Sequence, residues 1–213
     1  IADENDDVML VTALGRAIRF PTTEIRVFKS RGSTGVRGIR LGATDKVVSM
    51  AIIRHFEASP DERAAYLKQR RLVAGAPDDA AETDEDDEGV SVEAGQLSAE
   101  RYVEMSAAED LILTITTSGS GKLSSSHDYP VRGRGGMGVK AMDGAMRGGT
   151  LVASFPVVQT DQIMLATSTG QSIRVPVEQI SFRSRSAGGV KVFNTGGDEE
   201  VVSVARVAEQ GDE

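Results

Sequence analysis

The chain has 213 residues, with 24 Lys and Arg, 32 Asp and Glu, no Cys and no Trp, and its formal net charge is −8. The lack of Cys excludes disulfides and Cys-based metal sites, and no apolar run approaches the length of a transmembrane helix. The first residues contain neither a basic region nor a hydrophobic stretch, so a secretory signal is not expected. These features favour a soluble cytoplasmic protein with a core of aliphatic strands.

A segment of about fifty residues occurs three times along the chain, which is a period typical of propeller-like repeat arrays. Each copy opens with a short apolar run, and a glycine follows where a hairpin turn favours positive φ. The copies begin at Asp6, Asp110 and Asp161. The apolar runs cover residues 8–11, 112–115 and 163–166, and the glycines are Gly15, Gly119 and Gly170.

The rest of each repeat predicts further strands around a basic loop. A second strand is expected over 17–20 and 172–175, before Pro21 and Pro176, because proline suits a strand exit. Glycine-rich loops follow over 29–35, 132–138 and 183–189, and they run into Val36–Arg37, Val139–Lys140 and Val190–Lys191. The last strands are expected over 47–50, 151–154 and 201–204. Four short antiparallel strands per repeat are the content of one propeller blade.

An insertion over residues 55–109 separates the first two repeats. Ser59, Pro60 and Glu62 have the pattern of a capped helix start, and this helix is expected to run to about Val73. A second short helix is expected from Ser98 to about Ala107. Between them, nine acidic residues from 78 to 93 occur without a basic residue, which is typical of a disordered linker.

The charge of the chain divides unevenly between the repeats and the rest. Residues 8–54 and 110–208 together hold nineteen Lys and Arg and ten Asp and Glu, whereas residues 55–109 hold five basic and fifteen acidic residues. Because the basic residues recur at matching loop positions, we expect them to gather on one rim of the blade array. The simpler alternative is that these side chains only solvate an exposed face.

At these residues the chain resembles the C-terminal domain of the A subunit of bacterial DNA gyrase. The resemblance is carried by DVML from Asp7, TGVRGIRLG from Thr34, DKVVS from Asp45, DQIM from Asp161 and VAE from Val207. It implies an all-β fold, a propeller-like β-pinwheel of four-stranded antiparallel blades. This chain would supply the last three blades, with a mostly disordered or partly helical insertion. The expected organisation is blade repeats over 6–54, 110–160 and 161–208, the acidic insertion over 55–109 and an acidic tail over 209–213.

Two departures from the family pattern stand out. The family's heptapeptide, QRRGGKG, has no intact copy here, and its nearest relative, RGRGGMG from Arg132, has Gly133 and Met137 where the heptapeptide has Arg and Lys. The acidic insertion is the second departure. Besides a plain linker, it could act as an electrostatic mask that competes with DNA for the basic rim.

The resemblance implies a non-catalytic module that binds and wraps double-stranded DNA and so helps the gyrase holoenzyme to introduce negative supercoils. Phosphate contacts by Lys and Arg would give affinity with little sequence readout. The expected partners are DNA, the remainder of the gyrase A subunit, and the gyrase B subunit in the holoenzyme, on the chromosome in the cytoplasm and without a membrane. This segment needs no cofactor or metal, and ATP and magnesium are implied only for the parent type IIA topoisomerase. The expected DNA contacts are Arg31, Arg37, Arg40, Arg132, Arg134, Lys140, Arg183, Arg185 and Lys191, followed by Lys29, Arg16, Arg19 and Arg174.

Three alternatives remain open from the sequence. The equivalent domain of topoisomerase IV shares the blade, and a propeller-like adaptor would bind proteins through its faces. A catalytic interpretation rests on Arg101–Tyr102, since a tyrosine can form a covalent intermediate. We expect Tyr102 instead to pack from an insertion helix onto a blade. The two histidines, His55 and His127, have no nucleophile or metal-ligand partner in the sequence, and we expect both at the surface.

Overall fold

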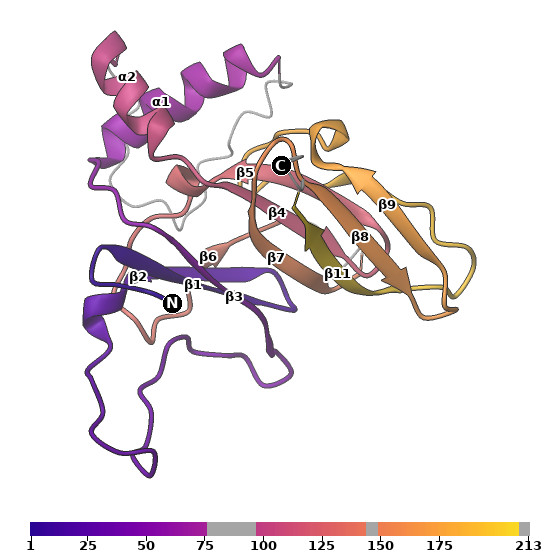
Figure 1. Cartoon of the computed structure of the whole chain (residues 1–213), viewed down its shortest axis with the longest axis horizontal. Coiled ribbons are helices and arrows are strands. Elements are labelled where there is room, and N and C mark those ends of the chain that lie inside the picture. Colours follow the sequence, from indigo (N-terminus) through magenta and orange to yellow (C-terminus); the bar gives the residue numbers. More distant parts are fainter. Residues whose placement is uncertain (76–96, 144–148, 209–213) are drawn as a thin grey trace, which may run out of the picture.

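The computed structural model describes residues 1–75, 97–143 and 149–208, which form three antiparallel sheets and a pair of helices (Figure 1). The first sheet contains β1 (Asp6–Thr12), β2 (Arg16–Pro21), β3 (Val47–Arg54) and the short β6 (Val139–Lys140), in the order β3-β1-β2-β6. The hairpin between β1 and β2 turns at Gly15, whose φ of 86° is the left-handed conformation that favours glycine. Gly119 and Gly170 make the equivalent turns, as the sequence predicts.

The second and third sheets follow the same plan. The second contains β4 (Leu111–Thr116), β5 (Ser120–Ser125), β7 (Leu151–Val157) and the short β10 (Val190–Lys191), in the order β10-β5-β4-β7. The third contains β8 (Gln162–Thr167), β9 (Ser172–Pro176) and β11 (Val201–Val207), in the order β11-β8-β9. A 3-10 helix follows the second strand of each repeat, at Thr22–Glu24, Ser126–Asp128 and Val177–Gln179. The prediction of propeller-like antiparallel sheets is confirmed.

The expectation that each repeat builds its own blade is wrong in one respect. Strand β6 belongs to the second repeat but pairs with β2 of the first sheet, and β10 belongs to the third repeat but pairs with β5 of the second. Each four-stranded sheet therefore takes its outermost strand from the following repeat. The equivalent residues of the first repeat, Val36–Arg37, are not in a strand of the described structure.

Aliphatic side chains fill the spaces between the sheets. One cluster joins Met9, Val11 and Ile53 of the first sheet to Ile112 and Leu151 of the second. Another cluster joins the second and third sheets through residues such as Leu113, Ile115, Ile163, Leu165 and Val201. Because β3 packs against β7, and β7 against β11, the edges formed by these strands lie inside the array. The edges formed by β6 and β10 lie on the opposite side, toward solvent.

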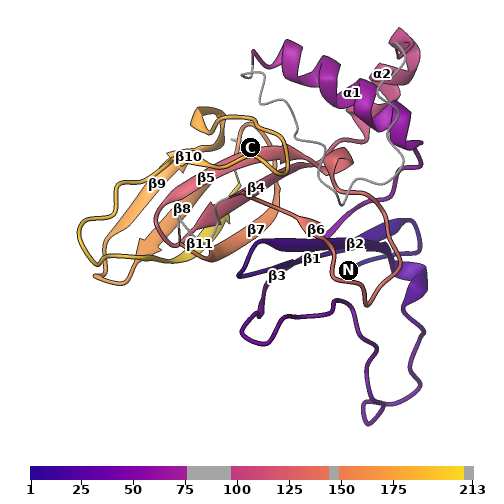
Figure 2. The same cartoon turned by 180° about the vertical axis from the view of Figure 1, so that it is seen from behind.

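The insertion forms two helices, α1 (Pro60–Val73) and α2 (Ala99–Ala107), at the positions that the sequence predicts. Ser59 and Glu62 make the expected capping box, since each side chain accepts a hydrogen bond from the other residue's backbone N–H. The helices lie at the opposite end of the first sheet from the long loop between β2 and β3 (Figures 1 and 2). The acidic residues from 78 to 93 lie outside the described residues.

Candidate nucleic-acid interface

Basic residues mark the outer edge of each completed sheet. Lys140 lies in β6 and Lys191 in β10, and each follows a glycine-rich loop from the same repeat. We call the loops 29–40, 132–140 and 183–191 the rim segments. β6 and β10 are the strands farthest from the packed inner edges, so these two strands form the outer edges of the array.

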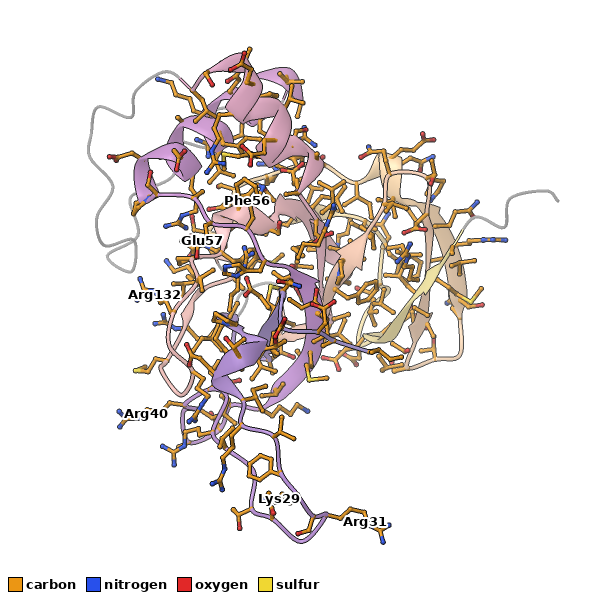
Figure 3. All side chains as sticks on the ribbon, turned by 60° about the vertical axis from the view of Figure 1, so that its left-hand side comes forward. Lys29, Arg31, Arg40, Phe56, Glu57 and Arg132 are labelled. Carbon is orange, nitrogen blue, oxygen red and sulfur yellow. The ribbon has the colours of Figure 1, made fainter. Side chains whose placement is uncertain are left out.

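Most of the sequence-predicted contacts do reach solvent. Lys29 and Arg31 lie at the tip of the protruding loop, and Arg40 and Arg132 lie on the same side of the molecule (Figure 3). The exposed side chains are Lys29, Arg31, Arg37, Arg40, Arg134, Arg174 and Lys191. Those of Arg16, Arg132, Lys140 and Arg183 are half-buried.

Arg16 and Lys140 form a pair of cations at the edge of the first sheet. They are directly opposite each other in the antiparallel pairing of β2 with β6, so their side chains leave the same face of the sheet. The carboxylate of Asp143 has an oxygen 3.8 Å from Nζ of Lys140.

Arg19 must be removed from the predicted contacts, because its side chain is buried. Its Nε lies 2.6 Å from a carboxylate oxygen of Asp7, which has no exposed surface. Its Nη1 donates to the carbonyl of Ser126 and its Nη2 to that of Arg54. Breaking a buried pair of this kind by removing one partner typically destabilises a protein by about 3–5 kcal/mol. Arg19 therefore ties the first sheet to the second repeat.

Arg185 must also be removed from that set. Its side chain is 1% exposed and makes a hydrogen bond to the carbonyl of Asp128 at 2.8 Å. The repeat pattern placed Arg185 on the rim with Arg31 and Arg134, but the loop of the third repeat is packed against the second repeat, through Lys122 and Asp128. The sequence-based prediction that all three lie on an open rim is wrong for this residue.

Lys122 and His127 are two further side chains whose burial was not predicted. Lys122 is fully buried, and its Nζ donates to the carbonyls of Ser184 and Ala187, at 2.9 and 2.6 Å. A signal for its burial was present, because the first and third repeats have Ile18 and Ile173 at the same position. Lys122 holds the rim segment of the third repeat against the second sheet.

His127 is the second case, and the prediction that it lies at the surface is wrong. It is 2% exposed, its Nε2 lies 2.8 Å from the carbonyl oxygen of Met105, and Tyr66 of α1 packs edge-on against its ring. Burial lowers the pKa of His127 below its ordinary value, although the hydrogen bond with the Met105 carbonyl acts in the opposite direction. The sequence could not show this, because the helices that cover His127 come from the insertion.

A cavity of about 530 Å³ lies between the insertion and the first sheet. Its lining includes Arg19, His55, Glu62, His127 and Tyr129. The charged groups among them already have partners: His55 and Arg19 both contact Asp7, and Glu62 contacts Arg101. Such an arrangement is typical of a packed junction, and these five lining residues supply no activated nucleophile.

Tyr102, the residue on which a catalytic interpretation rests, lies in α2. Its ring packs on that of Tyr66, with the two centroids 5.1 Å apart. Tyr102 therefore lies in an insertion helix as expected, but this ring contact is with the other insertion helix and not with a blade. Among the helices of the described residues, none combines the length and apolar character needed to cross a bilayer.

A family model described as "DNA gyrase C-terminal domain, beta-propeller" matches residues 6–54, 110–157 and 161–208. Among curated proteins, the DNA gyrase A subunit of Granulibacter bethesdensis is 46% identical over 215 residues, which cover 97% of this chain and 23% of that protein. The DNA gyrase A subunit of Rickettsia bellii is 38% identical over 213 residues, covering 99% of this chain and 23% of that protein. The chain thus spans 23% of the length of these two relatives.

Two solved structures share the fold at low sequence identity. The C-terminal domain of DNA topoisomerase IV has a TM-score of 0.65 and 19% identity, and the match covers 97% of this chain and 48% of the other. The C-terminal domain of E. coli ParC has a TM-score of 0.55 and 14% identity, with coverage of 98% and 63%. At these identities the two structures support the arrangement of sheets alone.

Proposed function

The chain belongs to the DNA gyrase C-terminal domain family, and on that basis we propose that it is a DNA-binding and DNA-wrapping segment of the gyrase A subunit. The observation that carries the proposal is the outer edge of the array, where exposed Lys and Arg recur on the rim segments of all three repeats. Cations on a convex edge can follow a bent phosphate backbone, and such contacts carry little sequence information.

The contacts that remain after the structure is taken into account fall into two groups. Lys29, Arg31, Arg37 and Arg40 lie on the rim segment of the first repeat, which protrudes from the array (Figure 3). The others follow the edges of the sheets: Arg16, Arg132, Lys140, Arg174, Arg183 and Lys191. Arg134 is exposed as well, but it is left out of both groups because it is bound to Glu24 and to the carbonyl of Arg37. Bending tens of base pairs costs roughly 1–6 kcal/mol, so several such contacts are needed to offset it.

The proposal includes the rest of the complex. The segment contributes DNA wrapping, while cleavage and ATP hydrolysis with magnesium belong to the remainder of the gyrase A subunit, together with the B subunit. The expected site of action is the bacterial chromosome in the cytoplasm. The curated relatives are gyrase subunits, which favours gyrase over topoisomerase IV as the parent enzyme. An adaptor that binds proteins through the faces of the sheets would not need cations along one edge.

The proposal is tested by titrating a labelled duplex of about forty base pairs with the chain at several salt concentrations and following fluorescence anisotropy. We expect log affinity to fall linearly with log salt, with a slope of about −0.9 for each phosphate neutralised. The double variant Arg37→Ala/Arg40→Ala should bind more weakly at every salt concentration, and its slope should be shallower by about 1–2.

Lys68→Ala is the matched control, because Lys68 is an exposed cation on α1, away from the rim segments. It should leave both the affinity and the slope close to those of the unmodified chain. Absence of binding even at low salt, or an equal loss in the control, would rule out the rim as the DNA-binding surface.

A further inference from the structure

The loop of the second repeat is fastened to the first repeat by Arg134. Its backbone N–H donates to a carboxylate oxygen of Glu24 at 2.9 Å. Its Nε donates to the carbonyl of the same Glu24 at 3.1 Å, and its Nη1 donates to the carbonyl of Arg37 at 3.3 Å. One arginine therefore holds both the 3-10 helix after β2 and a residue of the preceding rim segment.

Arg185 makes the same three contacts one repeat later. Its backbone N–H donates to a carboxylate oxygen of Asp128 at 2.6 Å, its Nε to the carbonyl of Asp128 at 2.8 Å, and its Nη1 to the carbonyl of Lys140. Glu24 and Asp128 are each the last residue of the 3-10 helix that follows a second strand. Arg37 and Lys140 each follow a Gly-Val pair. The two junctions thus share donors, acceptors and positions in the repeat.

We propose that Arg134 and Arg185 are positioning residues for DNA binding: each clasps the preceding repeat and fixes the rim cation, Arg37 or Lys140, whose carbonyl it binds. This inference rests on the proposed function, because it concerns how the rim is presented to DNA. It assigns these arginines to the junctions and not to the phosphates.

The shape of the guanidinium group explains why arginine occupies both positions. Nε and Nη1 point in fixed directions from one planar group, so they reach two carbonyls of the preceding repeat at once. A lysine ammonium has no such fork and would keep only the charge. Backbone hydrogen bonds reinforce the first junction, where Gly135 N–H donates to Gly38 O at 2.6 Å and Arg40 N–H donates to Gly136 O at 2.8 Å. Holding the rim segment in one conformation lowers the entropy lost when DNA binds.

Changing Glu24 distinguishes this inference from a purely electrostatic effect on DNA binding. Glu24 lies beside the rim, where its negative charge repels phosphate. If charge alone mattered, Glu24→Gln would strengthen DNA binding. If the clasp matters, the same change weakens binding, because a neutral amide oxygen is a weaker acceptor than the Glu24 carboxylate for the Arg134 backbone N–H.

The test uses the full chain, the same anisotropy titration, and a duplex with fluorophores at its two ends to report bending. Arg134→Lys keeps the charge, and Glu24→Gln makes the chain more positive by one. We expect each change to lower DNA affinity about three- to tenfold, with reduced bending and an unchanged salt slope. The double variant should lose more than either single variant, because Arg134→Lys removes the two guanidinium bonds to backbone carbonyls, whereas Glu24→Gln weakens the separate bond from the Arg134 backbone N–H.

Two controls carry the same chemical changes elsewhere. Arg71→Lys alters an arginine of α1, away from the rim segments, and Glu178→Gln removes an exposed carboxylate from the 3-10 helix of the third repeat. Both should bind DNA like the unmodified chain or slightly more tightly. The first junction is chosen because Arg134 is exposed, so its variants are expected to fold, and circular dichroism with thermal melting verifies that they do.

Two results would overturn the inference. One is Arg134→Lys binding like the unmodified chain while Arg134→Ala loses affinity and lowers the salt slope, which would make Arg134 a phosphate contact. The other is tighter binding by Glu24→Gln. Both leave the proposed function intact, whereas failure of the unmodified chain to bind DNA at low salt would refute the proposed function and this inference together.

Discussion

Arg31, Arg134 and Arg185 occupy the same position in the three rim segments, yet they lie in different environments. Arg31 is at the exposed tip of the protruding loop (Figure 3). Arg134 is exposed but bound to Glu24, and Arg185 is buried. Arg134 and Arg185 lie in loops that dock on the repeat before them. Composition and spacing identify the arginines, but the neighbouring repeat decides which of them can meet DNA.

His127 makes the stability of the chain depend on pH. The folded protein holds this imidazole neutral, because burial lowers its pKa, and Glu109, Asp110 and Arg19 are the charged groups that act on it. The unfolded chain binds a proton at His127 near pH 6.5. Below about that pH the unfolded state therefore binds more protons, and the free energy of unfolding falls until the pH passes below the folded pKa.

We expect the melting temperature of the chain to drop as the pH is lowered from about 7.5 to 5.5, and to drop less in His127→Phe. Phenylalanine keeps a ring against Tyr66 but cannot take up a proton. His55→Gln, which alters the half-exposed histidine bound to Asp7, is the control for loss of the other imidazole. Identical pH profiles for the unmodified chain and His127→Phe would show that His127 does not govern the acid sensitivity.

At the scale of single elements, the sequence predicts most strands and both helices but not the pairing of the shortest strands. Apolar runs beside a turn glycine identify the strands, and Ser59 with Glu62 identifies the start of α1. Val36–Arg37 and Val139–Lys140 have nearly the same sequence, yet only the second pair forms a strand. A run of two residues is too short to show an alternation of apolar and polar side chains, so the sequence alone does not predict whether it forms a strand. Val139–Lys140 forms one because it pairs with the edge strand β2 of the preceding repeat.

Gly138 is the residue that lets β6 approach that edge. Its φ is 71°, and a Cβ placed on it would lie 2.2 Å from the carbonyl oxygen of Ala17 in β2. We expect Gly138→Ala to lower the free energy of unfolding by about 1–3 kcal/mol, because the backbone must leave the left-handed region and move away from β2. Chemical denaturation measures the loss, and hydrogen exchange at Val139 should rise with it.

Gly133 provides the comparison for this prediction. It lies in the same loop, and a Cβ there would meet nothing within 4 Å. Gly133→Ala should therefore leave stability nearly unchanged. If the two alanine variants were equally stable, the close approach of β6 to β2 would not be what requires glycine at position 138.

At the scale of the whole molecule, the insertion connects all three repeats. Arg54 at the end of β3 donates to the carbonyls of Ala107 and Glu109, at 2.7 and 3.0 Å. Arg70 of α1 binds the Glu109 carboxylate at 3.0 Å and lies over the ring of Phe182, in the third repeat. The helices were predictable from their caps, but this role was not, because a capping pattern says nothing about which surface the helix covers.

The acidic residues from 78 to 88 allow a test of the insertion's effect on DNA binding. A solvated linker is the expectation, so changing these Asp and Glu to Asn and Gln should alter DNA affinity by no more than about twofold at 0.15 M salt, where charges beyond about 8 Å are screened. The anisotropy titration with the unmodified chain alongside measures this. Affinity that rises about tenfold at low salt and converges at high salt would establish the mask instead.

The exchange of outer strands between repeats also affects how the protein is synthesised. Strands β1, β2 and β3 have left the ribosome once residue 54 is free, but β6, which completes their sheet, ends at Lys140. At roughly 5–20 residues per second, translation of the intervening segment lasts about 4–17 s. During that interval the edge of β2 is unpaired, and Arg19 lacks its Ser126 acceptor. In this state the unpaired edge of β2 can pair with a strand of another nascent chain on the same messenger RNA. The insertion lengthens the time for which this edge stays exposed.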